Sequence, residues 1–237
     1  IGLKCGGSDG LSGITANPLI GRVSDLVVAA GGTSVMTEVP EMFGAEQLLM
    51  NRAHNEEIFT KTVSLINNFK HYFESHGETV SENPSPGNKA GGITTLEDKS
   101  LGCVQKGGKS EVMGVIKYGD SIEAAGLNLL QGPGSDGVSC SALAAAGTDL
   151  ILFSTGRGTP FATVIPTVKI STNSDLYKRK GGNWIDFDAG SIVNGRDFDE
   201  LALELLDYII AVASGKKTVS EKRGFHELLI WKDGVTL

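Results

Sequence analysis

The sequence predicts an α/β fold: a mainly parallel sheet flanked by helices, in Rossmann-like layers but without a nucleotide-binding motif. Two segments, residues 1–30 and 126–153, each combine short apolar strands with a glycine-containing loop and a helix. Parallel strands need crossover connections of this kind, and helices usually supply them. The strands are almost entirely apolar, as expected where a sheet is covered on both faces.

The first unit begins with a strand at residues 1–3 and continues through a glycine-rich loop at residues 5–13. Asn17 is the expected N-cap of the following helix, with Pro18 at its first position. Apolar residues then recur at helical spacing as far as Ala30. The loop lacks both the Walker pattern and GxGxxG, so we expect no nucleotide site.

The later elements follow from apolar periodicity and from the glycines and prolines that interrupt it. Gly147 is the expected C-cap of the helix that precedes it, because glycine readily adopts positive φ. The last residues, 224–231, are expected to form a strand or an extended tail. The remaining strands are predicted at 33–39, 112–118, 126–130, 149–153 and 167–170, and helices at 45–53, 55–76, 136–146, 175–178 and 198–212.

Residues 81–109 differ in character from the rest of the chain. Prolines and glycines at residues 83–88 and 91–92 argue against regular structure there, apart from a short helix near residues 97–103. Such a segment is either a solvated connection that divides the chain internally or an active-site loop. Both interpretations are open on composition alone.

The composition excludes several classes of protein. The 237 residues include 21 Lys and Arg against 28 Asp and Glu, and the net charge is −7. Without a long basic run, nucleic acid and anionic membrane surfaces are not expected as partners. No apolar stretch approaches the ~20 residues of a membrane helix, and no signal peptide is evident.

The sequence has three widely spaced cysteines, and this odd number does not indicate a disulfide framework. The absence of such a framework favours a reducing cytoplasm as the location. Cys140, in a helix of small residues, is expected to be a small core or loop residue, and the same interpretation is open for Cys103. For Cys5, a metal ligand and a small buried residue are equally open. The chain begins inside a predicted strand at Ile1, so we expect an excised domain of a longer protein.

Polar loops follow the predicted strands at the edge where open α/β sheets bind ligands. The loop at residues 154–160 places Arg157 between two glycines, which leaves its guanidinium open to a ligand carboxylate. We expect this loop and the loop at residues 5–12 to face one cleft. Hydroxyl, amide and ammonium groups near these strand ends suit a small polyhydroxylated anion.

Several long motifs give the chain a family resemblance: KCGGSDGLSGITANP at 4–18, TEVPEMFGAE at 37–46, FSTGRGTPF at 153–161, PTVKISTN at 166–173 and WIDFDAG at 184–190. Together they resemble the C-terminal part of the altronate/galactarate dehydratases, and TEVPE favours the altronate branch.

The resemblance implies that residues 1–237 are the C-terminal catalytic domain of a hydro-lyase, which dehydrates D-altronate to a 2-keto-3-deoxy sugar acid. It also implies a divalent metal, iron(II), and upstream domains of the same protein as partners. The family has a glycine- and lysine-containing stretch near residues 81–109, which favours the active-site loop there.

Two other interpretations of the chain's function are consistent with the sequence. The substrate can instead be galactarate or a sulfonated hydroxy acid, because related branches include a sulfolactate sulfo-lyase. Alternatively, this part is a scaffold or homo-oligomerisation domain, and an upstream part carries the chemistry.

Dehydration of a sugar acid needs a base for the α-proton, an acid for the leaving hydroxyl and cations around the carboxylate. Glu41 is a further candidate for the carboxylate that acts as acid or base. The sequence has no compact metal-binding motif such as HxxxH or CxxC. The predicted catalytic residues are Glu38, Lys106 and Asp136; the substrate-binding residues are Lys4, Ser8, Asp9, Arg157, Thr159, Lys169 and Asn173; the metal ligands are Cys5 and Glu38.

Overall fold

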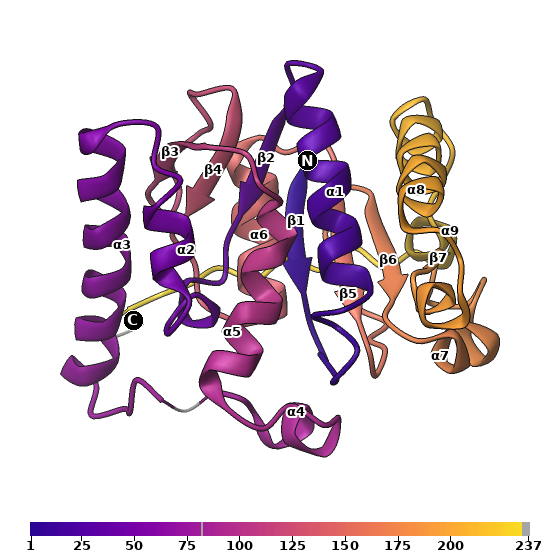
Figure 1. Ribbon diagram of the computed structural model, residues 1–237, viewed down its shortest axis with the longest axis horizontal. Coiled ribbons are helices and arrows are strands. Elements are labelled where there is room, and N and C mark those ends of the chain that lie inside the picture. Colours follow the sequence, from indigo (N-terminus) through magenta and orange to yellow (C-terminus); the bar gives the residue numbers. More distant parts are fainter. Residues whose placement is uncertain (82, 234–237) are drawn as a thin grey trace.

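The computed structural model describes residues 1–81 and 83–233. Within them, seven strands form one sheet in the order β3-β4-β2-β1-β5-β6-β7, and every pairing is parallel (Figure 1). The parallel sheet predicted from the sequence is therefore confirmed. The strands are β1 (Gly2–Cys5), β2 (Thr33–Met36), β3 (Val112–Ile116), β4 (Gly126–Leu130), β5 (Ile151–Thr155), β6 (Thr167–Ser171) and β7 (Phe187–Asp188).

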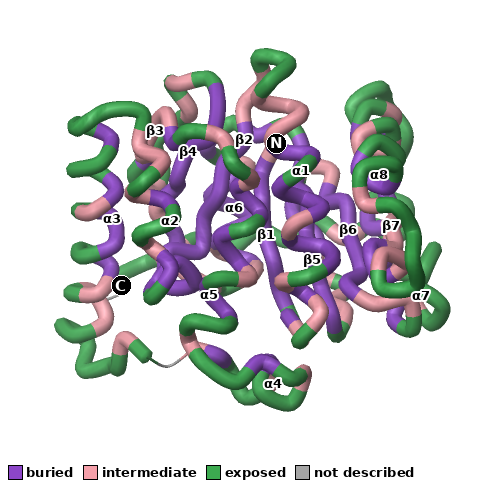
Figure 2. Tube along the Cα trace, in the orientation of Figure 1, coloured by how far each residue is buried: buried purple, intermediate pink, exposed green. Residues whose placement is uncertain are grey.

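Helices cover both faces of this sheet, and the inner strands β1, β4, β5 and β6 are wholly buried, whereas the edge strands β3 and β7 are partly exposed (Figure 2). The α-helices are α1 (Ala16–Ala29), α2 (Glu46–Met50), α3 (Glu56–Ser75), α4 (Pro86–Ala90), α5 (Leu96–Val104), α6 (Asp136–Ala146), α7 (Ser174–Lys180), α8 (Phe198–Ala213) and α9 (Val219–Arg223). The 3-10 helices are η1 (Val39–Glu41), η2 (Gln105–Gly107) and η3 (Gly190–Asn194). No helix in the described part of the chain is long and apolar enough to cross a membrane.

Successive residues of the central strands point to opposite faces of the sheet. Leu3 and Leu152 belong to the larger core, which includes residues of α1, α3 and α8. Ile151 and Phe153 belong to the smaller core under α6. At the end of β1 the same alternation places Lys4 on the α6 side, above Phe153, and Cys5 on the α5 side.

The start of α1 differs from the prediction. The helix begins at Ala16, after Thr15, so Asn17 is not its N-cap. The Asn17 amide instead donates to the Gly102 carbonyl at 3.0 Å, and its oxygen accepts from Ser154 Oγ at 2.5 Å. These contacts to distant segments outweigh the local capping preference.

The segment at residues 81–109 contains more regular structure than predicted. Pro86–Ala90 forms α4, because Ser85 and Asn88 make a capping box, and Thr95 caps α5. The prediction that residues 83–88 have no regular structure is therefore wrong. The capping hydrogen bonds offset the helix-disfavouring effect of the prolines and glycine in this segment. The proposed internal division of the chain stays a prediction.

Three other predictions can be compared with the structure. β2 ends at Met36 rather than residue 39, because Glu38 adopts a left-handed backbone before η1. The C-terminal segment 224–231 forms no strand; it is an extended tail whose Trp231 ring stacks on Phe69. Gly147 caps α6 with φ 98°, as predicted.

Candidate functional site

The carboxyl ends of β1 and β2 meet α5 and η2 in a buried group of charged and sulfur-containing side chains, which we call the ionic cluster. Every member has at most 7% of its surface exposed. The cluster consists of Lys4, Cys5, Glu38, Glu41, Lys99, Cys103 and Lys106.

Glu38 lies at the centre of the ionic cluster. Its Oε1 accepts from Lys4 Nζ, and its Oε2 accepts from Lys106 Nζ at 2.6 Å and from the Cys5 backbone N at 3.1 Å. Burial, together with Cys5 and Glu41, raises the pKa of Glu38 to about 7. Its φ of 68° is the one positive φ among the described non-glycine residues, a conformation that costs roughly 1–3 kcal/mol. The surrounding contacts therefore hold Glu38 in place against local strain.

Lys106 links the carboxylate to two sulfur atoms. Its Nζ lies 2.9 Å from Cys5 Sγ and 3.1 Å from Cys103 Sγ, so with Glu38 its three N–H groups have three acceptors. Burial lowers the pKa of Lys106, but Cys103, Cys5 and Glu38 outweigh it and raise this pKa well above the ordinary value. The hydrogen bond with Cys103 and the nearby ammonium charges lower the pKa of the Cys5 thiol, against the effect of burial. Lys106 therefore connects Glu38, Cys5 and Cys103 into one buried network.

Lys99 is the main residue that sequence analysis missed. Its Nζ donates to Glu41 Oε2 at 2.5 Å and to Ser8 Oγ at 3.2 Å, and lies 3.6 Å from Cys5 Sγ. Only the fold of α5 brings Lys99 to the end of β1, and the local sequence carries no signal of it.

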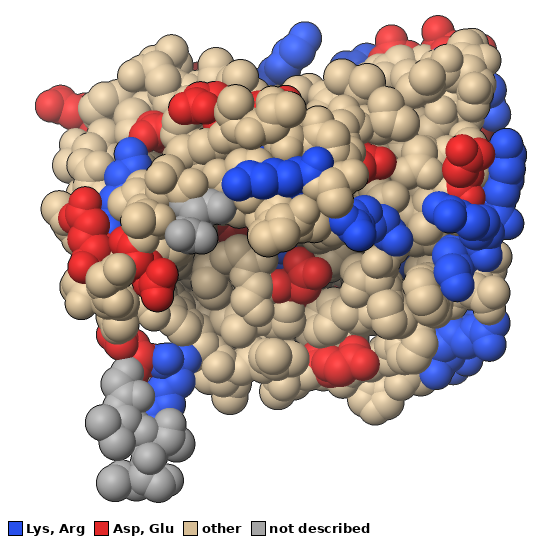
Figure 3. Space-filling model, turned by 90° about the horizontal axis from the view of Figure 1, so that it is seen from below, with Lys and Arg blue, Asp and Glu red and all other residues tan. Residues whose placement is uncertain are grey.

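A cavity of about 470 Å³ opens beside the ionic cluster, and a hollow is visible on this face of the molecule (Figure 3). The backbone N–H groups of Gly156 and Arg157 both donate to the Gly7 carbonyl at 3.0 Å, which joins the two predicted loops at its wall. The predicted common cleft is thus confirmed. Its polar side chains include Cys5, Ser8, Glu41, Lys99, Asp136 and Arg157.

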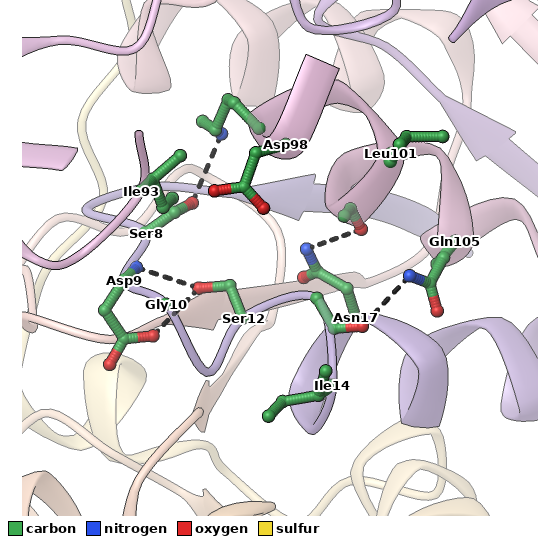
Figure 4. Close-up of a pocket in the computed structure, with 13 residues that line it drawn as sticks. Ser8, Asp9, Gly10, Ser12, Ile14, Asn17, Ile93, Asp98, Leu101 and Gln105 are labelled. Carbon is green, nitrogen blue, oxygen red and sulfur yellow. Dashed lines mark hydrogen bonds between the residues drawn. The ribbon is translucent and has the colours of Figure 1, made fainter. Parts of the chain in front are cut away.

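A smaller cavity of about 170 Å³ lies on the other side of Ser8, between the glycine-rich loop and α5 (Figure 4). Its lining includes Asp98 and Gln105, and Lys99 and Ser8 line both cavities. The hydrogen bond between Lys99 and Ser8 therefore lies where the two cavities adjoin.

The predicted carboxylate Asp136 lies at the wall of the larger cavity. Its Oδ1 is 2.9 Å from Lys4 Nζ, and 35% of its side chain is exposed. Arg157 also lines this cavity, and its Nη1 donates to the Gly87 carbonyl of α4 at 2.5 Å. Glu38, Lys4 and Lys106 lie behind the wall rather than on it.

Four predicted substrate-binding residues hold protein segments together instead of lining the larger cavity: Asp9, Thr159, Lys169 and Asn173. The Asp9 carboxylate accepts from Thr172 Oγ1 at 2.8 Å and from Asn173 Nδ2 at 3.0 Å. Asn173 also caps α7. The Thr159 carbonyl accepts from Lys169 Nζ at 2.8 Å. A substrate-binding role for these residues stays a prediction.

The sequence matches the family described as D-galactarate/altronate dehydratase, C-terminal, over residues 1–236. The chain belongs to this family. It is 59% identical over 236 residues to the altronate dehydratase of Escherichia coli (strain K12) and 60% identical over 238 residues to that of Bacillus subtilis (strain 168). Each match covers 100% of this chain and 48% of the relative.

Galactarate dehydratase (L-threo-forming) of Escherichia coli (strain K12) is 38% identical over 235 residues, or 97% of this chain and 44% of the relative. The chain thus spans about half the length of the curated relatives it matches. In this member of the D-galactarate/altronate dehydratase family, the motifs that carried the resemblance also build the site. KCGGSDG supplies Lys4, Cys5 and Ser8, and TEVPE supplies Glu38 and Glu41.

The metal that the family resemblance implies can be tested against these donors. Ligand atoms of Cys5, Glu38, Glu41 and Cys103 all lie within 4.8 Å of one another. The two sulfurs are 3.8 Å apart, close to the about 3.8 Å that separates two sulfurs around a tetrahedral ion with bonds near 2.3 Å. Thiolate and carboxylate donors suit a borderline divalent ion. The four side chains therefore fit a divalent metal ion by donor type and by spacing. In this structure the Lys106 ammonium is the cation that contacts three of them.

Cys103 is therefore both buried and part of the ionic cluster. The sequence left its role open, because a cysteine within a helix gives no sign of what the fold places opposite it. Cys140 does match the expectation: it is buried in the core under α6, where burial raises the pKa of its thiol to about 12.

Lys169 yields a pH-dependent prediction for stability. Burial lowers its pKa from 10.5 to about 8. Between these values the unfolded chain binds a proton that the folded chain has lost, so the free energy of unfolding rises with pH from about 8 to 10.5. The gain is on the order of 3 kcal/mol. Urea unfolding at both ends of this range should show the gain.

The Lys169→Met variant should lack this gain, and exposed Lys178→Met should retain it. If wild-type protein and Lys169→Met have the same pH dependence, Lys169 is not the group that titrates.

Proposed function

We propose that this chain is the catalytic part of a sugar-acid hydro-lyase that dehydrates D-altronate to a 2-keto-3-deoxy sugar acid. The main support is a cavity that combines an ammonium, a guanidinium and a carboxylate from Lys99, Arg157 and Asp136, in a member of this dehydratase family. The higher identity to altronate dehydratases than to a galactarate dehydratase favours altronate. The three free cysteines suit action in the reducing cytoplasm.

Asp136 is the proposed base that removes the α-proton. Its carboxylate lines the cavity, and Lys4 holds it at 2.9 Å from the other side. The base has to reach substrate directly, and of the three predicted catalytic residues Asp136 is the one on the cavity wall.

Cations at the wall would bind the substrate carboxylate and stabilise the enediolate that forms from it. Lys99 carries a pKa raised above its ordinary value, because Cys5 and Glu41 outweigh burial, and so stays charged. Arg157 presents a planar fork that matches a carboxylate. Ser8 Oγ accepts from Lys99 at 3.2 Å and is the proposed partner of a substrate hydroxyl.

Glu38 and Lys106 act from behind the wall as positioning residues. Glu38 orients Lys4, which in turn contacts Asp136, while Lys106 orients Cys5 and Cys103. A divalent metal, iron(II) in our proposal, would be held by Cys5 and Glu38 with Glu41 and Cys103. When bound, it supplies Lewis-acid stabilisation of negative charge on the substrate.

The intact protein should convert D-altronate to a 2-keto-3-deoxy acid, detected as the appearance of the keto acid. Galactarate and sulfolactate serve as comparison substrates. Faster turnover of galactarate would move the substrate assignment to the galactarate branch. Turnover of none of them, with self-association of this chain, would support the scaffold role instead.

Arg157→Lys should reduce kcat/KM by about 10- to 100-fold, because lysine keeps the charge but loses a charge-assisted hydrogen bond of roughly 1.5–3 kcal/mol. If this contact strengthens as the carboxylate gains charge, kcat falls and KM rises. Steady-state kinetics and a melting curve measure both effects.

Arg179→Lys, on the exposed surface of α7, is the matched control. Normal kinetics for Arg157→Lys would remove the residue from the site. A large drop in Tm with proportionate activity loss would show that Arg157 mainly holds α4 through the Gly87 carbonyl.

A further inference from the structure

We propose that Cys5 and Cys103 form a peroxide-sensitive pair, in which Cys5 is the sulfur first oxidised and Cys103 the sulfur that resolves it to a reversible disulfide. The site is a modification site within the ionic cluster, and peroxide is the chemical class of its reactant.

The geometry places the two sulfurs within reach of each other. Cys5 ends β1 and Cys103 lies in α5, 98 positions later in the chain, yet their Sγ atoms are 3.8 Å apart. A disulfide bond is about 2.05 Å long, so the sulfurs need to approach by under 2 Å. Rotation of the two side chains, with a small shift of α5, supplies a movement of this size.

The cavity gives a small oxidant access to one sulfur of the pair. Cys5 contributes to the wall of the 470 Å³ cavity, whereas Cys103 lies behind it and is absent from that wall. Peroxide is therefore expected to reach Cys5 first. This asymmetry assigns the attacking sulfur to Cys5 and the resolving sulfur to Cys103.

Two ammonium groups border Cys5. Lys106 Nζ lies 2.9 Å and Lys99 Nζ 3.6 Å from Cys5 Sγ. Lys106 also contacts Cys103 at 3.1 Å, so the same ammonium borders both reacting sulfurs.

The chemistry balances in two steps. The Cys5 thiol attacks one oxygen of hydrogen peroxide; the O–O bond breaks, a sulfenic acid forms, and one water leaves. The Cys103 thiol then attacks the sulfenic sulfur, the S–O bond breaks, and a second water leaves as the disulfide forms. Peroxide is reduced, and each thiol is oxidised by one electron.

The disulfide would change the ionic cluster at its centre. Both sulfur acceptors of Lys106 would be used in one covalent bond, and both sulfur donors of the candidate metal site would be lost. We therefore expect oxidation to stop turnover and dithiothreitol to restore it. This consequence rests on the proposed function, whereas formation of the crosslink does not.

The crosslink is tested by mass spectrometry on the full chain, treated with hydrogen peroxide in the presence of a chelator. Wild-type protein should lose the mass of two hydrogen atoms, and peptide mapping should join the segments that contain Cys5 and Cys103. Cys103→Ser and Cys103→Ala should instead gain one oxygen atom on Cys5, and Cys5→Ser should show neither product. Cys140→Ser, changed in the core under α6, should crosslink like wild type.

Absence of the Cys5–Cys103 crosslink in folded wild-type protein, or the same mass loss in Cys103→Ser, would overturn the proposal. A crosslink that leaves turnover of the intact protein unchanged would overturn its regulatory consequence. If the reduced intact protein has no dehydratase activity, the proposed function fails, and the mass measurement still decides the cysteine pair.

Discussion

Asp136→Asn is expected to lower kcat by about three orders of magnitude, within the range of roughly 10²–10⁴ that general-base catalysis contributes. The amide keeps the size of the side chain but cannot accept the α-proton. KM should change little, because Lys99 and Arg157 remain at the cavity wall. Steady-state kinetics on the intact protein measures both constants.

A melting curve distinguishes the loss of the catalytic base in Asp136→Asn from a folding defect. Lys4 retains its contact with Glu38 when the Asp136 charge is removed, and Asp136 is partly exposed, so Tm should change by only a few degrees. Asp175→Asn, in the exposed first turn of α7, is the matched control and should leave kcat and Tm unchanged. A kcat for Asp136→Asn within a factor of a few of wild type would exclude Asp136 as the base.

Glu38→Gln is expected to have the largest effect on stability. The change leaves the ammonium groups of Lys4 and Lys106 buried without their shared carboxylate. Removing one partner of a buried ion pair costs about 3–5 kcal/mol, and here two pairs lose the same partner. Urea unfolding above pH 8, where Glu38 with its pKa of about 7 is mostly ionised, should show a loss at least this large.

Turnover of Glu38→Gln should also fall, because Lys4 would no longer be held against Asp136. Glu204→Gln removes a carboxylate from an exposed pair with Arg196 and serves as the control, with little expected change in either quantity. If Glu38→Gln unfolds at the same urea concentration as this control, Glu38 does not neutralise the two lysines.

The fold was largely predictable because its strands are short apolar runs and its loops are marked by glycine and proline. Residues near these loops, such as Lys4, Cys5 and Glu38, could be placed at one edge of the sheet for the same reason. The order of strands follows from no local pattern, yet it sets β1 beside β2 and β5 and so decides which loops meet.

The parts of the site that escaped prediction depend on contacts between distant segments. Lys99 and Cys103 lie on a helix that was expected near residues 97–103, but nothing nearby in the sequence indicates that they face Cys5. Asn17 carries a strong local capping signal, but its partners are Gly102 and Ser154. In each case a long-range contact in the fold, rather than residue type, determines the role.

A crystal structure of the intact protein with the sugar-acid product bound tests the central claim most directly. The account predicts product density in the cavity beside the ionic cluster, with the product carboxylate on Arg157 or Lys99 and its reacting carbon facing Asp136. Product bound elsewhere in the intact protein, with this cavity empty, would contradict the account.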